Sequence, residues 1–132
     1  FLWLFFSHHS MQSTFREKLP LTKRMELSEK IRKAHYSKVP VIVDRAQDSP
    51  NLPLLEKQKY LTPQHFTIAN FTNEILNHIP VQEQSHICFF VGSGVRAMPS
   101  LLMQQVYEQY KDADGFLYIT YGEHKAMGAI CQ

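Results

Sequence analysis

The sequence contains little of what marks several large protein classes. Only two of its 132 residues are cysteine, too few for the disulfide framework of a small secreted domain. Its longest wholly apolar run, residues 1–6, is far shorter than the roughly 20 residues that span a bilayer. Cys88 lies inside an apolar run, where a free thiol behaves as a small buried hydrophobe. The sequence is therefore typical of a soluble, cytoplasmic protein.

Motifs for catalysis and for cofactors are also lacking. The segment Gly92-Ser93-Gly94 has neither the Gly-x-Ser-x-Gly frame of a nucleophile elbow nor the lysine and length of a phosphate-binding loop. No spacing of His, Cys and carboxylate residues fits a zinc site. We expect no enzymatic activity, no metal and no cofactor. An enzyme would need a reactive thiol, and a cysteine in a buried strand reacts slowly with thiol reagents.

Charge is unevenly distributed, although the net charge is only +2. Residues 1–66 hold 11 Lys and Arg against 6 Asp and Glu, which gives +5, and residues 67–132 hold 3 against 6, which gives −3. A basic half can face acidic peptides, anionic lipid or nucleic acid, or it can be a solvated surface with nothing bound. No platform of aromatic and basic side chains accompanies the charge, so we do not expect nucleic-acid binding.

Hydrophobic periodicity predicts one α+β domain. Helical spacing occurs in two N-terminal segments split by Pro20, in a segment that Thr67 can cap and Pro80 ends, and in a short segment from Ser100. Because Pro40 has no N–H to give to a ladder, we expect it at the start of its strand. The expected helices cover residues 13–18, 21–36, 68–79 and 100–110. The expected strands cover residues 39–45, 57–62, 86–91 and 116–121.

Residues 29–44 (EKIRKAHYSKVPVIVD) join a basic helix to a buried strand, and their sequence is distinctive. It resembles the autophagy-type ubiquitin-like modifiers, in the branch of the GABA-receptor-associated protein. Matching blocks follow at residues 59–61, 89–91 and 116–119. The resemblance implies a ubiquitin-like β-grasp, in which a central helix covers a four-stranded mixed sheet and two extra helices precede it.

This resemblance also implies an organisation of the chain into three parts. The ubiquitin-like domain with its N-terminal helices would occupy residues 13–121. We expect residues 1–12 to be a disordered or artefactual segment, since the likeness starts only after Met11. We expect residues 122–132, which show no periodicity, to be a flexible tail.

Residues 57–62 are the candidate binding surface. If they form a sheet edge, their unpaired backbone groups can accept an added strand, with Lys59 and Leu61 on one side and Tyr60 on the other. The resemblance implies that this edge binds short peptides in which an aromatic residue is followed, three positions later, by a branched aliphatic one. The aromatic side chain would enter a first pocket built by Leu27, Ile31, Pro40, Lys59, Leu61 and Phe116. The aliphatic side chain would enter a second pocket built by Tyr60, Pro63, Phe66, Phe71 and Ile75.

Charges around these pockets are expected to tune binding. Lys38, Lys57 and Lys59 would attract the acidic residues that usually precede the aromatic anchor. Lys38 stands where the family usually has Arg, so a bidentate grip on a carboxylate is lost. Glu74 stands close to the second pocket, where the family is usually apolar.

Some of the pocket residues have a second interpretation. Phe71 and Ile75 can equally well be core residues of one helix face. Leu61 and Phe116, which we expect to be partly exposed, are therefore the most informative pair.

Gly128 is the candidate processing and conjugation site. The resemblance implies that a cysteine protease cleaves after it, because a residue without Cβ can thread a narrow channel. Activating and conjugating enzymes would then pass its carboxyl through a thioester to the amine of phosphatidylethanolamine. Two acyl chains would anchor the product stably on an autophagosome membrane. Met127 departs from the aromatic residue that usually precedes this glycine.

The sequence thus favours a ubiquitin-like modifier of autophagy that recruits receptors by strand addition. A second hypothesis is an unconjugated adaptor that binds the same peptides in trafficking or on the cytoskeleton. Lipidation that depends on Gly128 separates the two.

Overall fold

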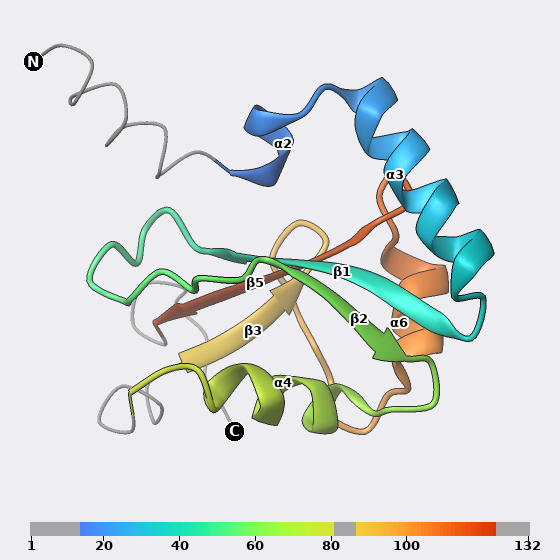
Figure 1. Cartoon of the computed structure of the whole chain (residues 1–132). Helices are drawn as coiled ribbons and strands as arrows, with labels where there is room; N and C mark the ends of the chain where they lie inside the picture. The colour runs from blue at the N-terminus through green and yellow to red at the C-terminus, as the bar shows by residue number, and fades with distance from the viewer. Residues whose placement is uncertain (1–13, 81–86, 124–132) are drawn as a thin grey trace, which may run out of the picture.

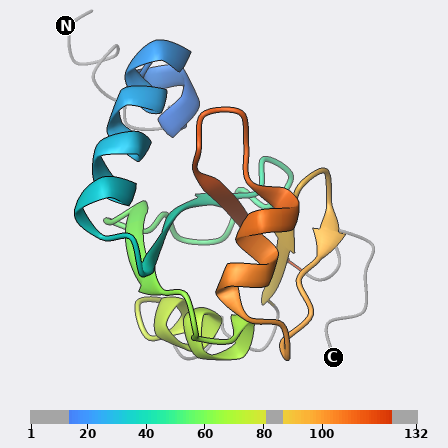
Figure 2. The ribbon, with the colours of Figure 1, turned by 90° about the vertical axis from the view of Figure 1, so that its right-hand side faces the viewer.

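The computed structural model describes residues 14–80 and 87–123. In Figures 1 and 2, α2 and α3 lie on one side of a sheet and α4 lies on the other. The two N-terminal helices are separated at Pro20, as predicted. In chain order the elements are α2 (Phe15–Lys18), α3 (Leu21–Ala34), β1 (Lys38–Arg45), β2 (Lys59–Pro63), α4 (Ile68–Leu76), β3 (Ile87–Val91), β4 (Val95–Arg96), α6 (Met103–Tyr110) and β5 (Leu117–Glu123).

Five strands form one mixed sheet in the order β2-β1-β5-β3-β4. β1 and β5 are parallel in its centre, and the other neighbouring strands are antiparallel. The arrangement confirms the predicted β-grasp class, with one strand more than the four expected. This strand, β4, follows Gly92 and Gly94, whose φ angles are 58° and 88°. Sequence periodicity missed it because two residues are too few to show an alternating pattern.

Alternation along the strands builds two separate apolar cores. On one face of the sheet, Val39, Val41 and Val43 of β1 pack into the main core with residues of α4 and α6. On the other face, Ile42 packs into a smaller core with Phe15 of α2 and half-buried residues of α3. Both faces of the central strand are therefore covered, and the N-terminal helices have a core of their own.

α4 begins where its capping pattern predicts. The hydroxyl oxygen of Thr67 accepts a hydrogen bond from the backbone N–H of Asn70, and the Asn70 side chain accepts one from the backbone N–H of Thr67. The helix ends at Leu76, earlier than the prediction from Pro80, because the chain tightens there into turns with hydrogen bonds between residues three apart. Its buried residues are Ile68, Phe71 and Ile75.

Pro40 is the third residue of β1 and lies directly opposite Leu61, so the prediction that it opens the strand is wrong. The register explains why it is tolerated. The N–H of Val43 donates to the carbonyl of Gln58 on the β2 side at 2.8 Å, so the even-numbered residues of β1 direct their N–H groups toward β5. Pairing with β5 begins only one residue after the proline. No hydrogen bond to β5 is therefore lost because Pro40 has no backbone N–H.

β5 continues to Glu123, so Gly122 and Glu123 belong to the sheet rather than to the expected tail. The N–H of Glu123 donates to Ser49 Oγ at 2.9 Å, which ties the end of the strand to the loop after β1. The other expectations for the tail, including Gly128, and those for residues 1–12 lie outside the described residues.

Cys88 on β3 is buried and disulfide-bonded, so the expectation of a free thiol is wrong. The apolar run around it correctly predicted its burial. A run of this kind carries no information on whether a cysteine is paired.

Candidate functional site

β2 forms one edge of the sheet, and β1 is its only neighbouring strand in the described part of the chain. It covers Lys59–Pro63, two residues later at its start than expected. The register leaves the backbone N–H and C=O groups of Lys59 and Leu61 directed away from β1. These groups can pair with the backbone of an added strand.

One face of this edge carries the residues predicted for the first pocket. Leu61 lies opposite Pro40, and Lys59 lies opposite Ile42 of the smaller core. Leu61 is only partly buried, as predicted, so it is available to a ligand. On this face Leu27 and Ile31 of α3 pack against the smaller core that contains Phe116. The register places Pro40, Lys59 and Leu61 on the strands beside it.

Phe116 is buried more deeply than expected. Its side chain is 1% exposed, and its ring packs edge-on against Phe15 of α2 with 5.3 Å between ring centres. The expectation of partial exposure is wrong because it could not include α2, which folds back over the strand from the far end of the sequence. Phe116 therefore belongs to the smaller core, against which half-buried Leu27 and Ile31 of α3 pack. Leu61 of β2 is also half-buried.

The opposite face of the edge carries most of the second predicted group. The ring of Tyr60 meets that of Phe71 edge-on, with 5.9 Å between ring centres. Phe71 and Ile75 are 0% exposed and belong to the main core, so they can act only as a floor. Tyr60 and Phe66 are partly buried and remain accessible. By alternation Pro63, the last residue of β2, lies on the face of Leu61 rather than with Tyr60.

The sheet thus separates the two groups of pocket residues. Along an added strand neighbouring side chains alternate between faces, so residues three positions apart point to opposite sides. A peptide strand added to this edge would therefore place one side chain on the α3 side and the side chain three positions later on the α4 side.

Comparison with known proteins identifies the family. A profile described as "Autophagy protein Atg8 ubiquitin like" matches residues 23–128. The chain belongs to the Atg8 family. It is similar to the Autophagy-related protein 8 of Dictyostelium discoideum, with 40% identity over 118 residues that cover 89% of this chain and 95% of the relative. Its identity to the Autophagy-related protein 8 of Candida glabrata is 36% over 118 residues, covering 89% and 98%.

A solved structure agrees with this assignment. The chain resembles Plasmodium falciparum Atg8 in a complex with a Plasmodium falciparum Atg3 peptide, with a TM-score of 0.75 and 30% identity. The match covers 83% of this chain and 95% of that one. The family and the ubiquitin-like fold predicted from the sequence are therefore confirmed.

A basic groove of about 500 Å³ lies between α2 and the start of β2 in this Atg8-family chain. Two of the three predicted lysines, Lys57 and Lys59, line it, whereas Lys38 lies on β1 opposite Pro63. Lys18 also lines the groove, and no local pattern in the sequence predicts this, because it depends on α2 lying beside β2. The groove is lined by Phe15, Lys18, Leu19, Glu56, Lys57, Gln58 and Lys59.

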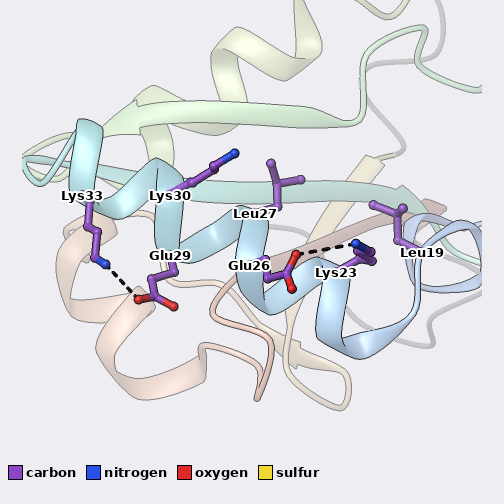
Figure 3. A pocket seen from close by; sticks show the side chains of 7 residues that line it. All are labelled: Leu19, Lys23, Glu26, Leu27, Glu29, Lys30 and Lys33. Carbon is purple, nitrogen blue, oxygen red and sulfur yellow. Dashed lines mark ion pairs between the residues drawn. The ribbon is translucent and has the colours of Figure 1, made fainter.

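A second groove, of about 520 Å³, runs along α3 (Figure 3). Leu27 and Lys30 extend from one side of the helix, away from Glu29 and Lys33 (Figure 3). Lys30 has no carboxylate partner within the described residues, so it adds an unpaired cation to this groove. Two exposed ion pairs line the groove, Lys23–Glu26 and Lys33–Glu29, with N–O distances of 3.8 and 3.0 Å.

Asp114, in the turn before β5, fixes α3 in place above this site. Its carboxylate accepts hydrogen bonds from Arg24 Nη1 at 2.7 Å and from the Tyr118 hydroxyl at 2.5 Å. The backbone carbonyl of Asp114 also accepts one from Ser28 Oγ at 2.5 Å. Burial and the hydrogen bond to Asp114 raise the pKa of Tyr118 to about 12. Because Leu27 and Ile31 project from the same helix, this network also positions these two side chains against the smaller core.

Two further observations concern residues 14–80 and 87–123 alone. No helix there is both long and apolar enough to cross a membrane. No group of three or more His, Cys, Asp or Glu residues there is arranged to hold a metal ion.

Proposed function

We propose that this Atg8-family chain is a ubiquitin-like modifier that recruits receptors to autophagic membranes by strand addition at β2. The observation that carries the proposal is the edge itself. Lys59 and Leu61 turn their backbone groups outward, while apolar side chains lie on both faces of the same strand. An extended peptide can therefore gain backbone hydrogen bonds and bury two side chains at once.

The proposed ligand is a short peptide with an aromatic residue, two intervening residues and a second anchor. The aromatic ring would bind over Phe116 between Leu27, Ile31 and Leu61. The second anchor would contact Tyr60 and Phe66 on the other face. Acidic residues ahead of the ring would meet the lysines of the basic groove. The solved structure of Plasmodium falciparum Atg8 contains a bound Atg3 peptide. This supports peptide binding as a capacity of the fold.

The second part of the proposal concerns the tail. A cysteine protease would remove residues 129–132, and activating and conjugating enzymes would join the carboxyl of Gly128 to phosphatidylethanolamine. The chain would be the substrate of these enzymes, and the two acyl chains of the lipid would hold it on the autophagosome membrane. The family match extends to residue 128, which supports this position as the end of the processed form.

Comparison of the wild type with Gly128→Ala in starved cells tests the conjugation. We expect the wild type to lose residues 129–132, to gain the mass of a phospholipid and to enter the membrane fraction. The variant should do none of these. An uncleaved tail that behaves identically in both proteins would contradict the modifier and would favour an unconjugated, peptide-binding adaptor.

A further inference from the structure

The α4 side of the β2 edge carries a carboxylate, that of Glu74, next to apolar side chains. Tyr60 contacts Phe71, and Glu74 follows Phe71 by one helical turn on α4. Residues three apart in a helix lie on neighbouring positions of its surface, so Glu74 lies next to the site that Tyr60 occupies. Burial and the charge of Glu74 together raise the pKa of the Tyr60 hydroxyl, which agrees with this closeness.

Glu74 has no counter-ion among residues 14–80 and 87–123. It is exposed, and no ion pair or hydrogen bond joins its carboxylate to any described residue. Lys57 Nζ lies 4.9 Å from the centre of the Tyr60 ring, and Lys57 forms no ion pair with a described carboxylate. The edge therefore carries lysines near α2 and over the Tyr60 ring, and at α4 a carboxylate that has no counter-ion among the described residues.

We propose that Glu74 makes the second pocket selective for a basic residue, so that the preferred peptide has Arg or Lys, rather than a branched aliphatic residue, three positions after its aromatic anchor. The inference rests on the proposed strand addition and specifies its partner. It also gives the peptide a charge order, with acidic residues before the anchor and a basic residue after it.

The shape of a long basic side chain suits this site. Its methylene stem can pack on the rings of Tyr60 and Phe66 while its charged end reaches Glu74. A leucine would cover the same rings but would take water from the carboxylate without offering it a hydrogen bond. Arginine or lysine can thus contact both the apolar rings and the carboxylate of Glu74.

Two peptides that differ only in Leu or Arg at this position test the inference. Their Kd values are measured with the full chain, by fluorescence anisotropy, for the wild type, Glu74→Gln and Glu74→Leu. We expect the wild type to bind the Arg peptide at least as tightly as the Leu peptide. Each variant should lower the ratio of Kd for the Leu peptide to Kd for the Arg peptide by about two- to five-fold, as expected for one exposed ion pair. High salt should reduce the wild-type ratio in the same direction.

Glu108→Gln is the matched control, because it removes one exposed carboxylate from a different helix, α6. It should leave the ratio unchanged. A ratio that is the same in the wild type and in Glu74→Gln would overturn the inference while both peptides still bind, and the strand-addition proposal would stand. If neither peptide binds any of these proteins, both proposals fall together.

Discussion

Arg24 on α3 and Asp114 before β5 form an almost wholly buried ion pair, with 2.7 Å between Nη1 and Oδ2. The Asp114 side chain has 0% of its surface exposed, and the Arg24 side chain has 12%. Asp114 also accepts hydrogen bonds from the Tyr118 hydroxyl and from the backbone N–H of Phe116. This pair joins the N-terminal helices to the ubiquitin-like body.

Loss of Arg24 should destabilise the fold strongly. In Arg24→Met the buried carboxylate of Asp114 loses its counter-ion, and we expect the free energy of unfolding to fall by about 3 kcal/mol. Urea denaturation followed by circular dichroism measures this change. Lys33→Met is the control, because its ion pair with Glu29 is exposed on both sides and should contribute less than about 0.5 kcal/mol. An equal decrease in the free energy of unfolding of the two variants would show that the buried ion pair stabilises the fold no more than the exposed one.

Tyr118 should make stability fall in alkaline solution. Its pKa is raised to about 12 in the folded protein, by burial and by the hydrogen bond to Asp114, from an ordinary value of about 10. The unfolded chain therefore loses this proton at a lower pH than the native one, and the free energy of unfolding decreases from about pH 10 to about pH 12. Urea denaturation across this range measures the decrease.

Tyr118→Phe should show a smaller alkaline decrease than the wild type, because this titration is removed. A residual decrease is expected, since burial also raises the pKa of Tyr60, Tyr107 and Tyr121. Tyr36→Phe, at an 81% exposed side chain, should retain the wild-type profile. Identical profiles for the wild type and Tyr118→Phe would refute the assignment.

Gly115 should tolerate no side chain. Its φ is +89°, and a Cβ there would lie 2.4 Å from Ser28 Oγ. Gly94 provides a control, since its φ is +88° but nothing lies within 4 Å of its Cβ position. Both alanine variants should lose about 1 kcal/mol to backbone strain, and Gly115→Ala should lose about 1–3 kcal/mol more to the collision with α3. Thermal unfolding distinguishes the two, and equal melting temperatures would argue against close packing of α3 on this turn.

Leu61→Ala should weaken peptide binding by about 1–3 kcal/mol, because the truncation removes a wall of the pocket for the aromatic anchor. Calorimetric titration with an aromatic-x-x-Leu peptide measures the change. Val95→Ala, at a 44% exposed residue on the opposite edge strand, is the control and should leave the affinity unchanged. An unaltered affinity in Leu61→Ala would place the aromatic anchor elsewhere.

Short-range patterns predicted several elements well. Thr67 and the apolar spacing after it predicted the start of α4, and Pro20 predicted the break between α2 and α3. The β-branched run that begins at Val39 predicted a buried strand. These features depend on residues within one or two turns of each other, where caps, proline and side-chain period act directly.

The candidate site was predictable only in part. The residue pattern around Leu61 predicted a strand, but its position at the edge of the sheet was a hypothesis that only the strand order could test. The residue pattern could not show that Phe116 is buried beneath Phe15 or that Lys18 lies beside Lys59, because these contacts depend on how α2 folds back onto the sheet. Register, likewise, decided that Pro40 could lie inside β1.

The sequence by itself determined most of the helical and extended segments, which side chains alternate into a core, and which family the chain resembles. Only the tertiary structure decided that Arg24 meets Asp114, and that the chain forms two separate cores. The reason is physical. Periodicity and capping are properties of neighbouring residues, whereas ion pairs, strand order and the depth of a pocket arise from surfaces that meet only when distant segments pack together.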